Sequence, residues 1–149
     1  MKKEIRELVE FALSDDLNKN ISIAIGEVNK KQADVIENEI GINLVGCQRY
    51  LDTSAIKHIL LRHGSAKNEE KRGQIAINID DFENIPTYIS NADSIIYLGK
   101  NKLKQDIFQY TTEENGLIVI LESVIINKRG NKMFIETMYK KKKSNDNKL

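Results

Sequence analysis

The sequence contains one cysteine, one proline and no tryptophan among its 149 residues. A single cysteine, Cys47, excludes a disulfide framework and a zinc site built from several cysteines. No run approaches the ~18 apolar residues that cross a bilayer, and the first residues hold no uninterrupted apolar stretch typical of a signal peptide. We therefore expect a reduced protein without a membrane segment, acting in the cytoplasm. Its length fits one domain.

The charge is nearly balanced, because 23 Lys and Arg residues oppose 22 Asp and Glu residues. Its distribution is uneven. From Asn127 to the end, eight basic residues face two acidic ones, for a net charge of +6, whereas the first 126 residues carry −5. This basic region is compatible with binding to nucleic-acid phosphates. A lysine-rich tail that only keeps the protein soluble explains the pattern equally well.

The first half of the chain shows mainly helical patterns. Apolar residues at helical spacing and capping residues predict helices over Lys3–Leu13, Glu27–Ile40 (followed by Gly41) and Thr53–His63. The pair Asp80 and Glu83 resembles a capping box for a short helical turn, and Pro86 can open a second turn that runs through Ile89.

The second half shows strand patterns. Strands are predicted over Gln74–Ile79, Ser94–Leu98, Asp106–Thr112, Leu117–Ile126 and Lys132–Lys140, with tight turns at Glu113–Gly116 and Lys128–Asn131. Ile42–Leu51 is expected to be extended, and Ser22–Ile25 is too short to assign. Because Leu117–Ile126 is apolar on both faces, it should be a central strand.

This order predicts an α+β fold, with N-terminal helices packed on a C-terminal antiparallel sheet. Residues 1–20 form a helix that belongs to the domain or is appended to it. Residues 21–140 form the domain itself, and residues 141–149 are expected to be a disordered lysine-rich tail.

The only two histidines lie in the third predicted helix. At ~100° per residue, His58 and Arg62 share one face, so an imidazole and a guanidinium together could contact a phosphate. His63 lies about 140° away, toward the apolar arc. It is therefore either a core histidine or a group that faces the sheet across the helix. A metal site is a poorer explanation, since the two imidazoles do not share a helical face.

The last predicted strand offers polar groups of another kind. Period-two alternation places Thr137 and Tyr139 on one face with Ile135, and Glu136 and Lys140 on the other. A hydroxyl and a phenol two residues apart can hydrogen-bond a phosphate or the edge of a base, although both are also ordinary strand residues. No Gly-x-Ser-x-Gly motif marks a nucleophile, and the glycines do not form a phosphate-binding loop.

The order of several segments resembles the phage- and prophage-associated branch of the Barnase–EndoU–colicin–RelE-like (BECR) nucleases, most closely its third subtype. The resemblance runs from about Ser22 to Lys140. Its segments are IGINLVGCQRYLDTSAIKHILLRHG, EEKRGQIAINIDDFENIP, the strand containing IFQY, and ETMYK. The resemblance implies helices packed on an antiparallel sheet with the active site on the sheet face. It also implies metal-independent cleavage of RNA without a cofactor, often by a toxin.

Such cleavage uses the neighbouring 2′-hydroxyl as nucleophile and leaves a 2′,3′-cyclic phosphate. It needs a base, an acid and donors that stabilise the charge on the phosphate. Within the resemblance, we expect His58 to be the base, His63 the acid or an orienting residue, and Arg62 a phosphate contact. Thr137 and Tyr139 would position the phosphate or a base. Secondary substrate-binding candidates are Lys140, Arg72 and Gln74, although alternation places Lys140 on the opposite face.

These expectations describe a ribonuclease toxin whose substrate is RNA, with tRNA as one candidate, and whose producer needs an immunity protein. The rival hypothesis is a non-catalytic phage or prophage module that binds nucleic acid or protein. A third interpretation makes the chain one piece of a longer toxin-delivering protein. The nine aromatic residues do not cluster, so a compact RNA recognised by shape suits the composition better than a single strand held by stacking.

Overall fold

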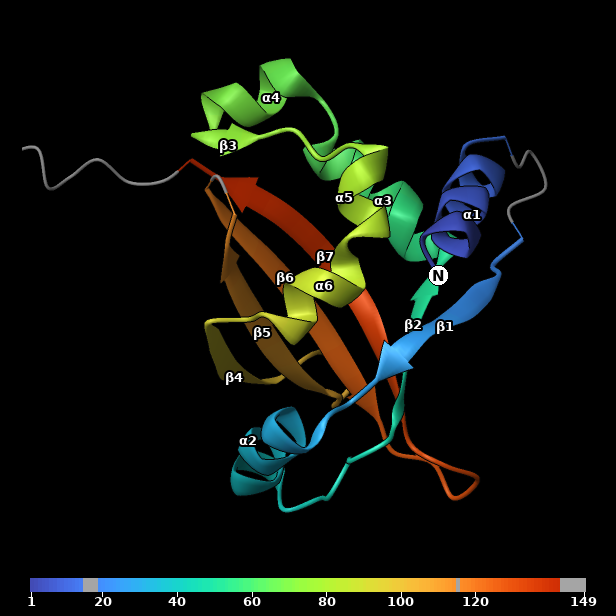
Figure 1. Cartoon of the computed structure of the whole chain (residues 1–149), viewed down its shortest axis with the longest axis vertical. Coiled ribbons are helices and arrows are strands. Elements are labelled where there is room, and N and C mark those ends of the chain that lie inside the picture. Colours follow the sequence, from blue (N-terminus) through green and yellow to red (C-terminus); the bar gives the residue numbers. More distant parts are fainter. Residues whose placement is uncertain (15–18, 115, 143–149) are drawn as a thin grey trace, which may run out of the picture.

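The computed structural model describes residues 1–14, 19–114 and 116–142, and it confirms the α+β class (Figure 1). The helices are α1 (Lys2–Ser14), α2 (Lys30–Ile40), α3 (Thr53–His63), α4 (Ala66–Lys71), α5 (Ile79–Glu83) and α6 (Ile85–Ser90). The strands are β1 (Ser22–Glu27), β2 (Gln48–Asp52), β3 (Gln74–Ile75), β4 (Ser94–Lys100), β5 (Asp106–Glu113), β6 (Leu117–Ile125) and β7 (Lys132–Lys141).

The seven strands form one sheet in the order β1-β2-β7-β6-β5-β4, with β3 added beside the end of β7. All neighbouring pairs are antiparallel except β2 and β7, which run parallel. The predicted C-terminal meander is therefore β4 to β7, and β2 joins it from the first half of the chain. β6 lies between β5 and β7 and is buried along most of its length, so the prediction of a central strand is confirmed.

One face of the sheet carries the core. Helices α5 and α6 lie across this face, with α2 near one end (Figure 1). Fully buried side chains from these helices and from the strands meet there, among them Phe82, Ile89, Phe108, Ile135 and Met138. The alternate residues of the strands point to the opposite face, which we call the open face.

Several predicted helices agree with the structure. α1 is one residue longer at each end than the predicted Lys3–Leu13, and α3 begins and ends as predicted. The helix predicted from Glu27 starts only at Lys30, because Asn29 is its N-cap and accepts a hydrogen bond from the Gln32 main chain. Gly41 ends α2 in the left-handed conformation, at φ 73°.

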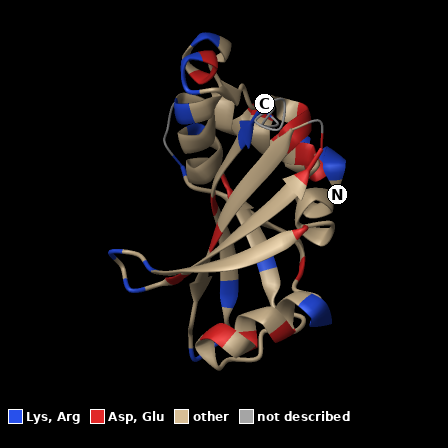
Figure 2. Cartoon of the chain, turned by 90° about the vertical axis from the view of Figure 1, so that its left-hand side faces the viewer, with Lys and Arg blue, Asp and Glu red and all other residues tan. Residues whose placement is uncertain are grey.

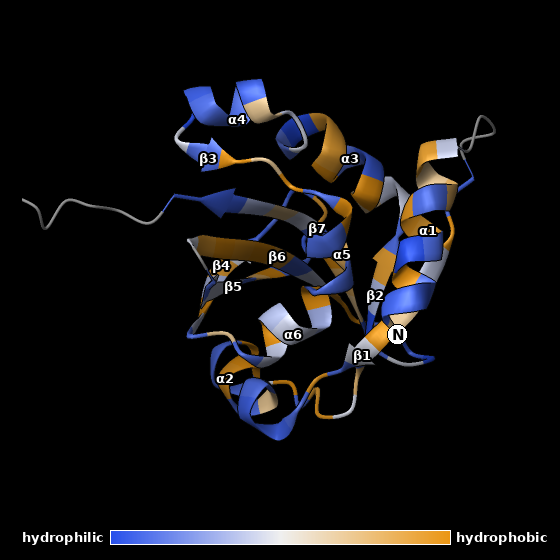
Figure 3. Cartoon of the chain, turned by 45° about the horizontal axis from the view of Figure 1, so that its top comes forward, coloured by the Kyte–Doolittle hydropathy of each residue, from blue (hydrophilic) through white to orange (hydrophobic). Residues whose placement is uncertain are grey.

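Other predictions are wrong in part. Only the first two residues of the expected strand Gln74–Ile79 pair with β7, because Ile79 already begins α5. The capping box of α5 is formed by Asn78 and Asp81 rather than by Asp80 and Glu83. α4 was not predicted, since its sequence AKNEEK has no apolar periodicity. With β3 it forms a largely hydrophilic corner of the molecule (Figure 3).

A β-bulge alters the faces of β7. Leu121 pairs with Thr137 and Glu122 pairs with Ile135, which leaves Glu136 as the extra residue. Ile135 and Met138 therefore both point into the core, and strict alternation fails at this point. Thr137 lies on the face opposite Ile135, which corrects the prediction that they share one.

A buried polar network crosses the core. Arg49 Nε donates to Glu122 Oε2 at 2.6 Å, and Tyr110 donates to Glu122 Oε1 at 2.7 Å. Gln32 Oε1 accepts from Arg49 at 3.4 Å. Burial favours the neutral form of Arg49, but Glu122 and Tyr110 raise its pKa above the ordinary value, so the pair is ionic. The network ties β2 to β5, β6 and α2.

The first helix packs onto the rest of the fold through ion pairs. Arg6 of α1 forms ion pairs with Asp80 and Glu83, so α1 is attached to α5. Among the described residues, no helix combines the length and apolar character needed to cross a membrane. Of the predicted tail, Lys141 belongs to β7, and residues 143–149 lie outside the described residues.

Candidate active site

The junction between β2 and α3 positions His58. Asp52 is the last residue of β2 and also the N-cap of α3, where its side chain accepts a hydrogen bond from the Ala55 main chain at 2.7 Å. Ile56 and Ile59 are fully buried and anchor the helix against the core. His58 is exposed on the other side of the helix. The strand and the helix therefore hold this imidazole in a defined place beside β7.

A cavity of about 400 Å³ lies between α3 and β7, and we call it the His58 cavity. Its lining residues are Asp52, Ser54, Ala55, His58, Glu136 and Thr137. The structure thus brings together His58 and Thr137, two of the residues singled out from the sequence. It also adds two carboxylates. Nothing in the sequence placed Asp52 in the site, and alternation placed Glu136 on the wrong face because the bulge has no signal in the sequence.

The surroundings of the two acid–base groups shift their pKa values in opposite directions. Partial burial lowers the pKa of His58 below 6.5, and the nearby Arg62 and His63 lower it further. Burial raises the pKa of Glu136 above 4.5, Asp52 adds to this rise, and Ser123 opposes it. Since Glu136 is exposed, screening limits the shift. An imidazole whose pKa is lowered and a carboxyl group whose pKa is raised are suited to the roles of base and acid.

His63 is not a core histidine. Its Nδ1 lies 3.2 Å from Oε2 of Glu69, and its ring lies against that of Tyr139, with centroids 5.5 Å apart. The Glu69 carboxylate is fully buried and also accepts from Arg72 at 3.0 Å. Of the two alternatives drawn from the sequence, the structure favours the histidine that faces the sheet. The contact with Glu69 fixes the orientation of the His63 ring.

The chain reaches Glu69 through a tight turn at Gly64. A Cβ atom at Gly64 would lie 2.5 Å from the Leu60 carbonyl oxygen, so only glycine fits without a shift. Ser65 then caps α4, and this short helix carries Glu69 back over α3. Arg72 donates to the Arg62 main-chain oxygen at 2.9 Å and closes the loop.

Two buried polar atoms on this side of the molecule have no hydrogen-bond partner within the described ranges. They are Oγ1 of Thr137, which lines the His58 cavity, and Oε1 of Gln74. Gln74 pairs with Lys141 at the end of β7. Buried polar groups in folded proteins nearly always have a partner, but both atoms are closed to solvent, so a ligand reaches them only after a rotation of the side chain.

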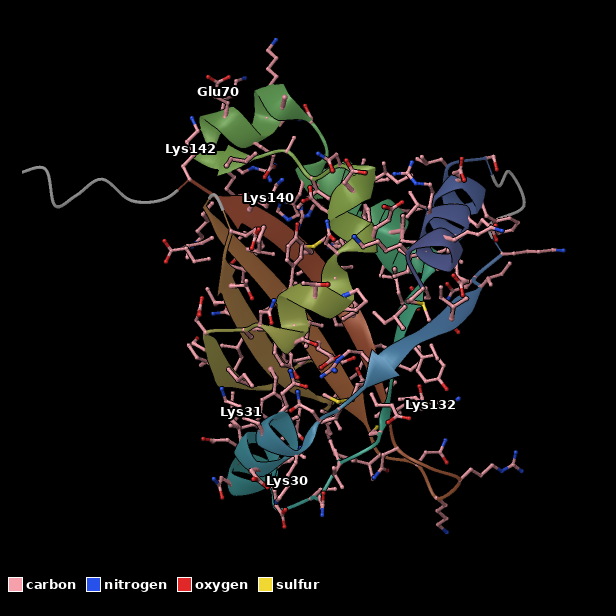
Figure 4. The ribbon with its side chains drawn as sticks, viewed as in Figure 1. Lys30, Lys31, Glu70, Lys132, Lys140 and Lys142 are labelled. Atoms are coloured by element: carbon pink, nitrogen blue, oxygen red, sulfur yellow. The ribbon has the colours of Figure 1, made fainter. Side chains whose placement is uncertain are left out.

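The remaining candidates divide between the two faces. Arg62 is exposed and lies close enough to His58 to affect its pKa. Tyr139 lies on the open face beside His63. Lys140 does not reach this region, because its Nζ binds the buried Asp81 at 3.0 Å and its side chain is only 17% exposed (Figure 4). It is held on the core face, as alternation indicated.

A helix-covered sheet whose open face holds imidazole, carboxyl and hydroxyl groups is consistent with the fold of BECR nucleases. The family model described as phage-Barnase-EndoU-ColicinE5/D-RelE like nuclease3 matches residues 26–148. The chain belongs to this family, as the resemblance predicted, and is therefore a nuclease of the BECR type that acts on nucleic acid. No curated protein and no solved structure matches the chain significantly. Over residues 1–14, 19–114 and 116–142, no cluster of three or more His, Cys, Asp or Glu side chains could hold a metal ion.

Proposed function

We propose that this protein is a metal-independent endoribonuclease that leaves a 2′,3′-cyclic phosphate. The observation that carries the proposal is the His58 cavity, where an imidazole, a carboxyl group and an unpaired hydroxyl lie together. RNA rather than DNA is the substrate because the nucleophile is the 2′-hydroxyl next to the scissile phosphate. The cytoplasm is the proposed site of action.

His58 is the general base in this proposal. Its lowered pKa keeps the imidazole neutral near pH 7, so it can take the proton of the 2′-hydroxyl. The oxygen then attacks phosphorus, and the bond to the 5′-oxygen breaks. The leaving oxygen needs a proton, which the protonated form of Glu136 can supply, and its raised pKa extends the pH range over which that form is populated. His63, held by Glu69, is the orienting residue beside Tyr139.

The phosphate needs donors and positive charge during the reaction. Thr137 lines the cavity and can offer its unpaired hydroxyl after a rotation of its side chain, and Arg62 offers a guanidinium on the same helix as His58. Tyr139, Arg72 and Gln74 extend this set along the open face. Figure 2 shows basic segments at the tip of the projecting hairpin and, mixed with acidic ones, at the helices near the top. We propose that the RNA backbone is held by these basic ends.

The direct test is incubation with total bacterial RNA in EDTA, followed by mapping of the product ends. Ends that carry a 2′,3′-cyclic phosphate are expected. Intact RNA under all conditions would contradict the proposal and favour a non-catalytic module of the same fold. Toxicity on expression, relieved by an immunity protein from the same source, would support a toxin role, and cleavage confined to tRNA would identify the substrate.

The rate of cleavage should depend on pH with a maximum in the mildly acidic range. His58 must be unprotonated, so kcat/KM rises as the pH increases through a pKa below 6.5. Glu136 must be protonated, so kcat/KM falls as the pH increases through a pKa above 4.5. We therefore expect a bell-shaped profile with its maximum between the two pKa values. Initial rates with a short RNA over about pH 4 to 8 would measure it.

The variant Glu136→Gln checks the assignment of the acid. It should lower kcat by about 10- to 100-fold and remove the descending limb of the profile. If the descending limb remains in Glu136→Gln, another group such as His63 donates the proton.

The role of Glu69 can be tested separately. Glu69→Gln keeps the shape of the side chain but removes the charge that holds the His63 ring, so we expect kcat to fall about 10-fold with little change in KM. Its neighbour Glu70, which points outward from α4 (Figure 4), supplies the matched control Glu70→Gln. Equal activity of the two variants would show that the orientation of His63 does not matter for the reaction.

A further inference from the structure

A second cavity, of about 240 Å³, lies on the open face next to the His58 cavity. Asp52 and Glu136 line both cavities, so the two are adjacent. The other lining residues are Leu103, Gln105, Ser123, Ile125 and Phe134. They come from the loop between β4 and β5 and from strands β6 and β7. Apart from Glu136, the proposed chemistry uses none of the residues that line this second cavity.

Its walls combine an aromatic surface with apolar side chains. The Phe134 ring stacks on Tyr50 of β2, with centroids 5.3 Å apart and planes 23° apart, and this contact fixes the orientation of the ring. Leu103 is 76% exposed and lies at the mouth of this cavity with much of its apolar surface uncovered. A flat aromatic group could lie against Phe134 and cover Leu103 at the same time.

The polar edge of the cavity is oriented by the loop. Asn101 Oδ1 accepts from the main-chain N–H groups of Leu103 and Gln105, both at 2.9 Å. The amide nitrogen of Asn101 must therefore face Gln105, and it donates to Gln105 Oε1 at 3.1 Å. This leaves the NH₂ group of Gln105 without an acceptor in the described part of the chain. A fixed donor thus lines the same cavity as the Asp52 carboxylate, an acceptor that the proposed chemistry does not use.

We propose that this second cavity binds an unpaired nucleobase next to the scissile phosphodiester. The base stacks on Phe134, and its edge accepts from the NH₂ group of Gln105 and donates to the Asp52 carboxylate. This inference rests on the proposed function, because it places the phosphate in the His58 cavity. A base can enter only if it is unstacked from a helix, so the substrate class is RNA with an unpaired nucleotide at the cleavage site. Gln105 is then a specificity-determining residue.

The test uses the unmodified protein and the four nucleoside 3′-monophosphates, with ribose 5-phosphate as a probe that lacks a base. Binding is followed by NMR shifts of backbone amides. We expect the nucleotides to bind at least about 10-fold more tightly than ribose 5-phosphate, with shifts at Gln105, Ser123 and Phe134. Equal binding of nucleotides and ribose 5-phosphate, or shifts confined to other residues, would overturn the proposal.

Two variants sharpen the result. Phe134→Leu should weaken nucleotide binding about 10-fold through lost stacking. Gln105→Leu should weaken it about 3- to 10-fold and change the ranking of the four bases. The control is Gln109→Leu. Gln109 lies on the open face of β5 but does not line the cavity, so this variant should bind nucleotides as the unmodified protein does. Unchanged binding in both cavity variants contradicts the proposal.

These measurements separate the two proposals, because mononucleotides are not cleaved. Nucleotide binding at Phe134 without any RNA cleavage would refute the nuclease mechanism and retain the base site. Cleavage of RNA without nucleotide binding at Phe134 would refute the base site alone.

Discussion

Replacing His58 by alanine should reduce RNA cleavage by about 10²- to 10⁴-fold, the range that general acid–base catalysis typically contributes. The variant removes the base that takes the proton of the 2′-hydroxyl, while Glu136 and Thr137 stay in place. We therefore expect the loss in kcat, with KM changed by less than a factor of about three, since phosphate contacts remain. Initial rates on a short fluorogenic RNA would measure both parameters.

The stability of this variant provides a first control. His58 is exposed and His58→Ala opens no core cavity, so its unfolding midpoint in urea should match that of the unmodified protein. Leu61→Ala, at a position 82% exposed on the same helix, should retain full activity. Activity of His58→Ala within a factor of about five would contradict the assignment of the base.

His63→Ala supplies the second comparison. Because we assign His63 an orienting role, His63→Ala should lose less activity than His58→Ala. Complete loss of activity in both variants, with normal folding in each, would make His63 a direct participant in proton transfer.

The fold could be predicted from the sequence wherever one periodicity dominates. α3 and the four strands β4 to β7 have clear apolar patterns and lie within three residues of their predicted limits. The failures occur in short polar segments. α4 depends on Ser65 as a cap and on contacts made by Glu69, which no local pattern shows. The parallel pairing of β2 with β7 joins segments about 80 residues apart, and short-range patterns carry no information about it.

The part of the candidate site that lies on α3 could be predicted from the sequence. Helical spacing and the resemblance to the BECR nucleases both pointed to His58, and the structure places Thr137 in the same cavity. Glu136 could not be assigned to this face, because a bulge shifts the alternation of side chains between the two faces of a strand and no residue type marks where it occurs. Glu69 was visible only as a carboxylate beyond the glycine, and its burial depends on how the turn at Gly64 folds.

The largest expected effect on stability concerns the Arg49–Glu122 pair. Arg49→Met should lower the free energy of unfolding by about 3–5 kcal/mol, because it leaves the buried Glu122 carboxylate without its cation. Tyr110 still donates one hydrogen bond to this carboxylate, but a hydroxyl cannot neutralise it. For a domain of this size such a loss is a large part of the total stability. Urea unfolding followed by circular dichroism would measure it.

A double variant separates the cost of the orphaned charge from that of lost packing. In Arg49→Met combined with Glu122→Gln, the amide oxygen can still accept from Tyr110 and no buried charge remains. The double variant should therefore be at least about 1 kcal/mol more stable than Arg49→Met alone. Lys30→Met is the matched control, because Lys30 is 84% exposed in its pair with Asp34 and points away from the sheet (Figure 4). It should change stability by less than about 1 kcal/mol. If Arg49→Met costs no more than Lys30→Met, then Glu122 is not held as a charged group, and the ionic description of the core is wrong.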